Sequence, residues 1–156
     1  MKTKIVVLMI TLAVMFFAGP TQAQVRDETI LTYKVLTEEW HNLIGGVLDL
    51  TGAEAEAFWP VYEEYAAVKG ALWNERIDVI KMFLAGYDTM GPEVARGLLD
   101  ASFEIKGKML ALERAYADRF DDILPPAKAV RLFQAENKLE TIMAMEITKD
   151  IPLAKK

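Results

Sequence analysis

The stretch Glu38-Glu39-Trp40-His41 holds the residues best suited to bind a metal ion. A glutamate and a histidine three residues apart lie on one side of a helix, and di-iron bundles carry this unit on two helices. Here the unit occurs once, and His41 is the only histidine. Glu136 and Glu140 are four residues apart and could face it. We predict no bound metal, and Glu38 and His41 are the candidate ligands should one bind.

Nucleophilic catalysis is not expected from this composition. The sequence has no cysteine, and Ser102, its only serine, would have to meet His41 to form a catalytic triad. Eight methionines raise the alternative of a copper site, but Met1, Met9 and Met15 lie in a predicted signal peptide, and methionine commonly fills gaps in a core. We predict that the protein is not an enzyme and has no cofactor.

The N-terminus has the form of a secretory signal peptide. Two lysines precede an uncharged apolar run, and Gly19-Pro20 leads to Thr21-Gln22-Ala23, which has small residues at the positions that a signal peptidase reads. We predict cleavage after Ala23, export to the periplasm, and a single domain at residues 24–156. The run of about 14 residues is short for a membrane anchor, the alternative interpretation.

The charge of the mature chain argues against nucleic acid and anionic lipid as partners. Removing residues 1–23 leaves 16 basic residues against 23 acidic ones, a net charge of −7. An acidic protein is repelled by both polyanions. Because there are no disulfides, packing alone must stabilise the fold.

The mature chain has helical periodicity and no strand-like alternation, so we predict an all-α protein with four helices. Apolar spacing and the Gly and Pro breakpoints place these at 27–47, 51–84, 92–124 and from 126 to just before Ile151. The third has the strongest period (Val94, Leu98, Ala101, Ile105, Met109, Leu112, Tyr116, Phe120). Two long antiparallel helices would form an elongated hairpin or bundle, whose leftover apolar face would favour a homodimer.

The second predicted helix begins with a capping box. Thr51 and Glu54 have the spacing at which each side chain bonds the other residue's backbone amide. Four aromatic residues follow in the first turns of this helix. Pro60 lies among them, and we expect the helix to kink there. We expect Phe58, Val61 and Tyr65 in the core. We expect Trp59 and Tyr62 near the edge, which makes them the candidate partner or client surface.

The last predicted helix carries polar residues on its apolar face. Asn137 lies four residues after Phe133, on the side expected to be buried. A buried amide needs partners, and Glu63 or Tyr65 across the helix interface could supply them.

These features together resemble the Spy/CpxP family of periplasmic stress proteins. The family motif, Leu-Thr-x-x-Gln (LTXXQ), starts two helices. Here Leu50-Thr51-Gly52-Ala53-Glu54 is similar to the first copy, with Glu in place of Gln, and Leu124-Pro125-Pro126-Ala127-Lys128 keeps the leucine and the helix start of the second. The resemblance covers most of residues 27–153. This chain is acidic, whereas named members are basic on the face that binds clients.

The resemblance implies a curved helical dimer that binds unfolded or partly folded exported proteins without ATP, as an envelope-stress chaperone. Some members instead bind the periplasmic domain of a membrane sensor, so a signalling adaptor is the alternative. A metal-responsive sensor is a further alternative.

Overall fold

The computed structural model describes Trp40 and residues 42–155, and all regular secondary structure in this part is α-helical. A short helical segment at residues 42–48 precedes three long helices: α3 (Gly52–Gly86), α4 (Pro92–Ile123) and α5 (Pro126–Thr148). The predicted helical bundle is confirmed, and the bounds of the long helices lie within two residues of those expected up to residue 126. The predicted signal peptide and the range 27–39 fall outside the described residues.

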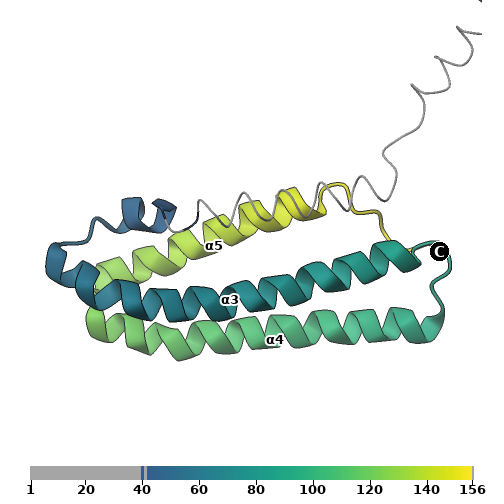
Figure 1. Ribbon diagram of the computed structural model, residues 1–156, viewed down its shortest axis with the longest axis horizontal. Coiled ribbons are helices and arrows are strands. Elements are labelled where there is room, and N and C mark those ends of the chain that lie inside the picture. Colours follow the sequence, from purple (N-terminus) through teal and green to yellow (C-terminus); the bar gives the residue numbers. More distant parts are fainter. Residues whose placement is uncertain (1–39, 41, 156) are drawn as a thin grey trace, which may run out of the picture.

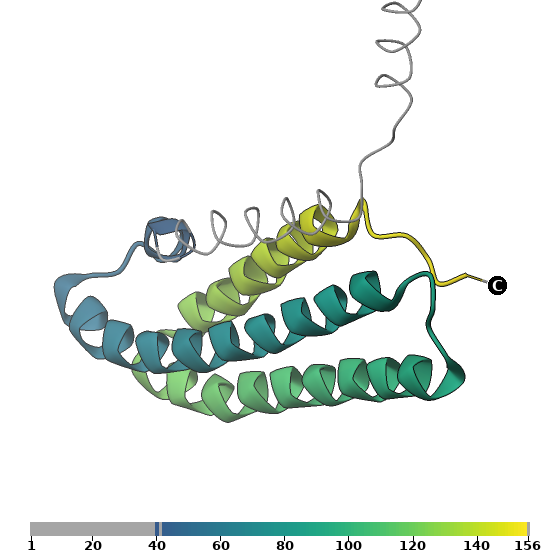
Figure 2. The ribbon, with the colours of Figure 1, turned by 45° about the vertical axis from the view of Figure 1, so that its right-hand side comes forward.

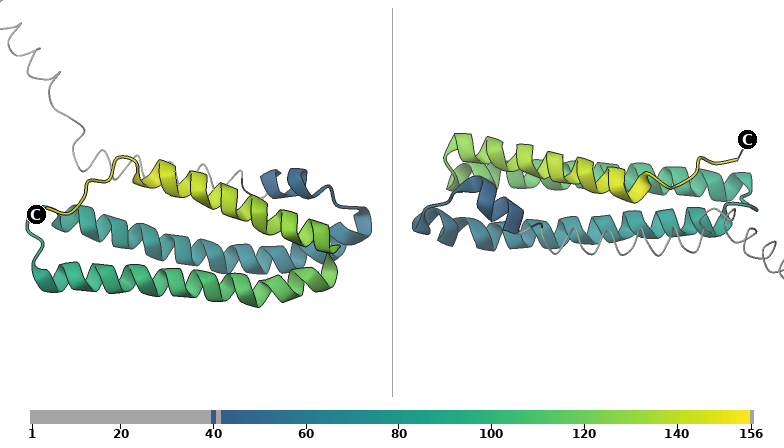
Figure 3. Two further views of the ribbon diagram at one scale, coloured as in Figure 1. Left: turned by 180° about the vertical axis from the view of Figure 1, so that it is seen from behind. Right: turned by 90° about the horizontal axis from the view of Figure 1, so that it is seen from above.

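The long helices make an elongated antiparallel assembly (Figure 1). α3 and α4 lie side by side along their lengths, and α5 turns back from the end of α4. With 35 residues, α3 extends about 52 Å. α5 stays close to α4 only near the turn that joins them and then diverges from it (Figures 2 and 3).

Local sequence signals determine where each long helix begins and ends. Thr51 caps α3, while Pro92 and Pro126 occupy first positions of α4 and α5, where a missing amide hydrogen costs nothing. Leu124 is extended, as expected for a residue that precedes a proline, and it ends α4. α3 runs through the exposed Pro60 without interruption, so the proline does not divide it into two helices.

The core lies between α3, α4 and α5 and under the segment 42–48. The aromatic residues form its densest part: the Phe120 ring has neighbouring rings from α3, α4 and α5 with centroids 5.7 to 6.4 Å away. The main buried apolar residues are Ile44, Leu48, Phe58, Tyr62, Tyr65, Leu72, Trp73, Ile77, Met109, Leu112, Phe120, Leu132, Met143 and Ile147.

The predicted capping box is present and also joins two helices. The Thr51 amide donates to Glu54 Oε2 at 2.7 Å, and the Glu54 amide donates to Thr51 Oγ1 at 3.4 Å. Lys128 Nζ, near the start of α5, donates to the same Glu54 carboxylate at 2.7 Å and to the Asp49 carbonyl at 2.6 Å. The start of α3, the start of α5 and the chain before α3 are therefore held at one point.

These hydrogen bonds make the stability of the folded protein depend on pH. The hydrogen bonds from Lys128 and then from the Thr51 backbone lower the pKa of Glu54 from 4.5 to about 2. A carboxyl whose pKa is lower in the folded chain stabilises it above the unfolded pKa, and this contribution is lost as the pH falls. We expect Glu54→Gln to destabilise the protein at pH 7, with a deficit that shrinks between pH 4.5 and about 2.

Urea unfolding at a series of pH values tests this, with Glu56→Gln on an exposed turn of α3 as the control. A deficit for Glu54→Gln that does not change with pH would contradict the assignment of the low pKa to Glu54.

Candidate functional site

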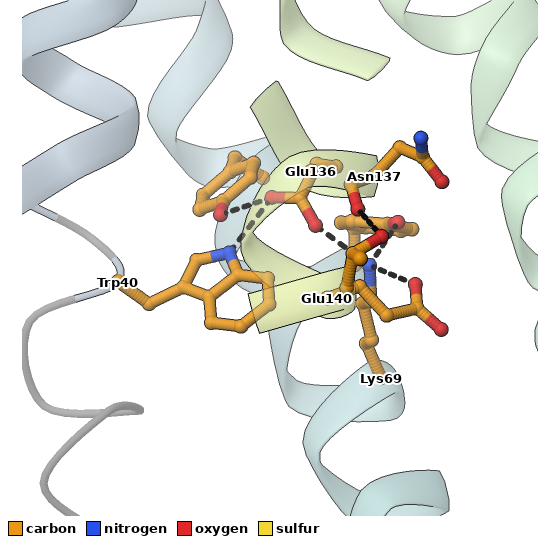
Figure 4. Close-up of polar contacts among 8 residues, drawn as sticks. Trp40, Lys69, Glu136, Asn137 and Glu140 are labelled. Atoms are coloured by element: carbon orange, nitrogen blue, oxygen red, sulfur yellow. Dashed lines mark hydrogen bonds and ion pairs between the residues drawn. The ribbon is translucent and has the colours of Figure 1, made fainter. Parts of the chain in front are cut away.

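A buried ion pair connects α3 and α5 at the centre of the molecule. Lys69 Nζ lies 2.7 Å from Glu136 Oε2, and both residues are almost completely buried. The second oxygen of Glu136 accepts hydrogen bonds from the Tyr62 hydroxyl at 2.7 Å and from the Trp40 indole nitrogen at 3.0 Å. Figure 4 shows these side chains converging on the Glu136 carboxylate. Both oxygens of the buried carboxylate therefore have partners.

Lys69 is also fully engaged. Its ammonium donates to the Tyr65 hydroxyl at 3.3 Å and lies 3.4 Å from Glu140 Oε2. It lies 5.5 Å from the centroid of the Trp40 ring, within cation–π distance. Three helical elements and four neighbouring side chains thus satisfy one buried cation–anion pair.

The charge states of this network follow from its surroundings. Burial disfavours the charged form of Lys69, but the attraction of Glu136, Tyr65 and Glu140 outweighs it and raises the Lys69 pKa. Burial, followed by the Glu136 charge, raises the pKa of Tyr62, so its hydroxyl remains a donor. A closed set of satisfied bonds offers no activated nucleophile or base, and we interpret the network as a structural clamp.

Two sequence-based assignments are wrong at this network. Tyr62, expected at the edge, is only 2% exposed, because its hydroxyl finds a buried acceptor in Glu136. Asn137, expected to be buried, is exposed and points away from the clamp, while its neighbour Glu136 takes the buried position (Figure 4). Tyr62 is therefore not part of a free partner surface.

The remaining aromatic residues near the start of α3 mostly lie where the sequence predicts. Phe58 and Tyr65 are buried, as expected, and Val61 packs against the core. Trp59 is half-buried, and a Cβ atom added to Gly45 would lie 3.3 Å from its ring. Trp59 thus packs beneath the segment 42–48, and only part of it is accessible.

The candidate metal ligands, Glu38 and His41, lie outside the described residues. Within Trp40 and residues 42–155, no cluster of three or more acidic or histidine side chains is placed to hold a metal ion. Glu136 and Glu140, which could have completed such a site, bind Lys69 instead. None of the helices in this same part combines the length and the hydropathy that a membrane span requires.

The surface carries an apolar feature that the sequence reasoning missed. Leu99, Phe103 and Leu110 on α4 are 47%, 61% and 51% exposed. With Ala117 they are spaced by four and seven residues, which places all four on one side of the helix. We call these four residues the α4 track. The spacing can be read from the sequence. It was missed because the buried stripe of α4, whose members such as Met109 lie one position before the track residues, has the stronger period.

At one end, the α4 track enters a shallow groove between α4 and α5. This groove has a volume of about 540 Å³ and is open along one side. Its apolar lining is Ala117, Ala129, Val130 and Phe133, and Asp118 and Asp121 stand at its α4 wall. The track and the groove lie in line along α4, with Lys106 between Phe103 and Leu110 and Glu113 between Leu110 and Ala117.

Comparisons of this chain with protein-family models, with curated proteins and with solved structures gave no match. The fold and the surface therefore carry the functional argument, and the Spy/CpxP-like assignment stays a prediction from the sequence.

Proposed function

We propose that this is an exported, ATP-independent chaperone-like protein that holds apolar segments of unfolded or partly folded proteins on the α4 track. The observation that carries the proposal is the exposure of Leu99, Phe103 and Leu110 in a line on a long, well-packed helix. Large apolar side chains that gather in the open on one side of a helix mark interaction sites in water-soluble proteins. The proposed periplasmic location rests on the predicted signal peptide, and the proposed stress role rests on the LTXXQ-like residues.

The dimensions of the track suit an extended segment. Leu99 and Ala117 are 18 residues apart on α4, which corresponds to about 27 Å. An extended chain advances about 3.3 Å per residue, so roughly eight residues of a client would cover this distance. A contact of that size gives reversible binding, as a holding chaperone requires, because short apolar contacts must offset the loss of chain entropy.

The negative charge at the groove favours clients that carry basic residues. Asp118 and Asp121 line the groove, and the sequence as a whole has a net charge of −5. Apolar segments flanked by lysine or arginine would meet complementary charge there. This preference is opposite to the one implied for the basic members of the Spy/CpxP family.

Removing the apolar character of the track is the direct functional test. We expect Phe103→Ser combined with Leu110→Ser to weaken the suppression of aggregation of a reduced, unfolding client by at least about tenfold in effective concentration, since two large apolar contacts are lost. Val68→Ser is the matched control, because Val68 is 46% exposed on α3 and lies outside the track.

Both variants change exposed residues, so helical content and melting should be unchanged and any functional loss is attributable to the surface. Equal suppression by the wild type and the double variant would contradict client binding on the track. Absence of suppression by the wild type would instead favour the alternative of an adaptor that binds a single membrane sensor.

The homodimer remains a prediction that bears on the same surface. A two-fold interface that included Phe103 would cover the track and compete with clients. We therefore propose that any dimer forms through a different face, and sedimentation of the wild type and the Phe103→Ser, Leu110→Ser variant measures this. A variant that becomes monomeric would show that the track is the dimer interface.

A further inference from the structure

A cavity of about 290 Å³ lies between the second half of α3, the first half of α4 and the second half of α5. It is distinct from the α4 track, because its walls are the inward sides of α3 and α4 together with α5. Half of the ten lining residues are apolar, namely Val79, Ile80, Ile105, Met109 and Ile151. The volume is close to the lower end of the range for small-molecule sites in proteins.

One wall of the cavity carries an arginine whose donors have no hydrogen-bond partner among the described residues. The Arg76 guanidinium stacks on the Trp73 ring with its central carbon 4.6 Å from the ring centroid, which fixes its orientation. A guanidinium has five N–H donors, yet within Trp40 and residues 42–155 no hydrogen bond or ion pair satisfies them. Burial lowers the pKa of Arg76, and the charge of Glu140 offsets this effect only in part.

The other charges at the cavity define the ligand charge that would suit it. Glu140 lines the cavity but already lies 3.4 Å from Lys69, and it forms no ion pair with Arg76. Lys106 also lines it, with its ammonium 5.5 Å from the Phe103 ring centroid. Arg76 and Lys106 are positive and Glu140 is negative, so the lining of the cavity has one excess positive charge. A singly charged anion would balance this charge, whereas a dianion would be repelled by Glu140.

We propose that the cavity binds a small amphipathic monocarboxylate, with its carboxylate on the Arg76 guanidinium and its alkyl chain against Ile80, Ile105 and Met109. The planar guanidinium matches a carboxylate through two parallel hydrogen bonds. The apolar part of the lining suits a hydrocarbon body better than a sugar or a nucleotide. This site is independent of the proposed client binding, so either can fail without the other.

Calorimetric titration with decanoate, below the concentration at which it forms micelles, tests the proposal on the protein as processed by the producing cell. We expect saturable binding of one decanoate per chain, and binding of the uncharged decanol weaker by at least about tenfold, because a charged hydrogen-bonded pair is absent. Arg76→Gln should weaken decanoate binding by at least about tenfold. Arg96→Gln, which removes an exposed arginine paired with Asp100, should leave the affinity unchanged.

A second variant protects the test against a folding defect in Arg76→Gln. Ser102→Leu narrows the cavity from α4 and leaves Arg76 in place, so it should also weaken decanoate binding. No saturable binding to the wild type would overturn the proposal. Equal affinities of the wild type for decanoate and decanol, or undiminished binding in both variants, would overturn it too.

Discussion

Lys69→Met should lower the free energy of unfolding by about 3 to 5 kcal/mol, since it removes one partner of a buried ion pair. The substitution preserves the length of the side chain, so little packing is lost. What remains is the Glu136 carboxylate, buried between α3 and α5 with two neutral donors, Tyr62 and Trp40, and no cation at 2.7 Å. Chemical denaturation of the purified variant measures the loss.

Two further variants show whether the uncompensated charge causes this effect. Lys81→Met removes a lysine from the same helix whose exposed pair with Asp78 should contribute less than about 1 kcal/mol. Lys69→Met combined with Glu136→Gln removes both charges and keeps a carbonyl oxygen for the Tyr62 hydroxyl. We expect the double variant to be more stable than Lys69→Met alone. A double variant no more stable than Lys69→Met alone would contradict a coupled pair.

Phe120→Ala should cost about 3 to 5 kcal/mol, the range for removing a fully buried aromatic ring. Phe120 is 0% exposed, and its ring lies at the centre of a group formed by Phe58, Tyr65, Tyr116 and Phe133. These residues come from all three long helices, so the cavity left behind cannot close by the movement of one helix. The loss should appear as a lower denaturant midpoint with an unchanged slope.

The same helix supplies a control with identical chemistry. Phe103 is 61% exposed, so Phe103→Ala should change the free energy of unfolding by no more than about 0.5 kcal/mol. A small effect at Phe120, or similar effects at both positions, would contradict the helix orientation on which the α4 track depends.

The fold was largely predictable because the dominant signals are local. The capping residues Thr51 and Glu54, the prolines at positions 92 and 126 and the apolar period of α4 all act within a few turns of one helix. Such signals determine where helices begin and end without knowledge of their neighbours. Val94, at the start of the α4 period, is an exception, since it is exposed at an end of the helix where little packs against it.

The clamp could not be predicted because it depends on pairings between distant helices. Lys69 follows Phe58, Tyr62 and Tyr65 at steps of four and three, which places it on the buried stripe of α3. A lysine there indicates a buried anion somewhere in the fold, but Asn137 and Glu136 are adjacent, and a rotation of 100° decides which of them faces α3. Tyr62 was misplaced for the same reason, because its buried acceptor is 74 residues away.

The α4 track could be recognised only after the orientation of α4 was known. Its leucines and phenylalanine are compatible with a core, and the four-and-seven spacing alone does not separate a buried stripe from an exposed one. The structure shows that the stripe containing Ile105, Met109 and Leu112 faces inward, which leaves Leu99, Phe103 and Leu110 on the surface.

Photo-crosslinking of an unfolded client from position 103 tests client binding on the α4 track most directly. Benzoylphenylalanine in place of Phe103 keeps an aromatic ring on the track, and the same residue in place of the exposed Asn74 on α3 is the control. We predict client crosslinks from position 103 that greatly exceed those from position 74. Equal crosslinking from both positions, or crosslinks from position 103 only to a second copy of the chain, would contradict client binding on the α4 track.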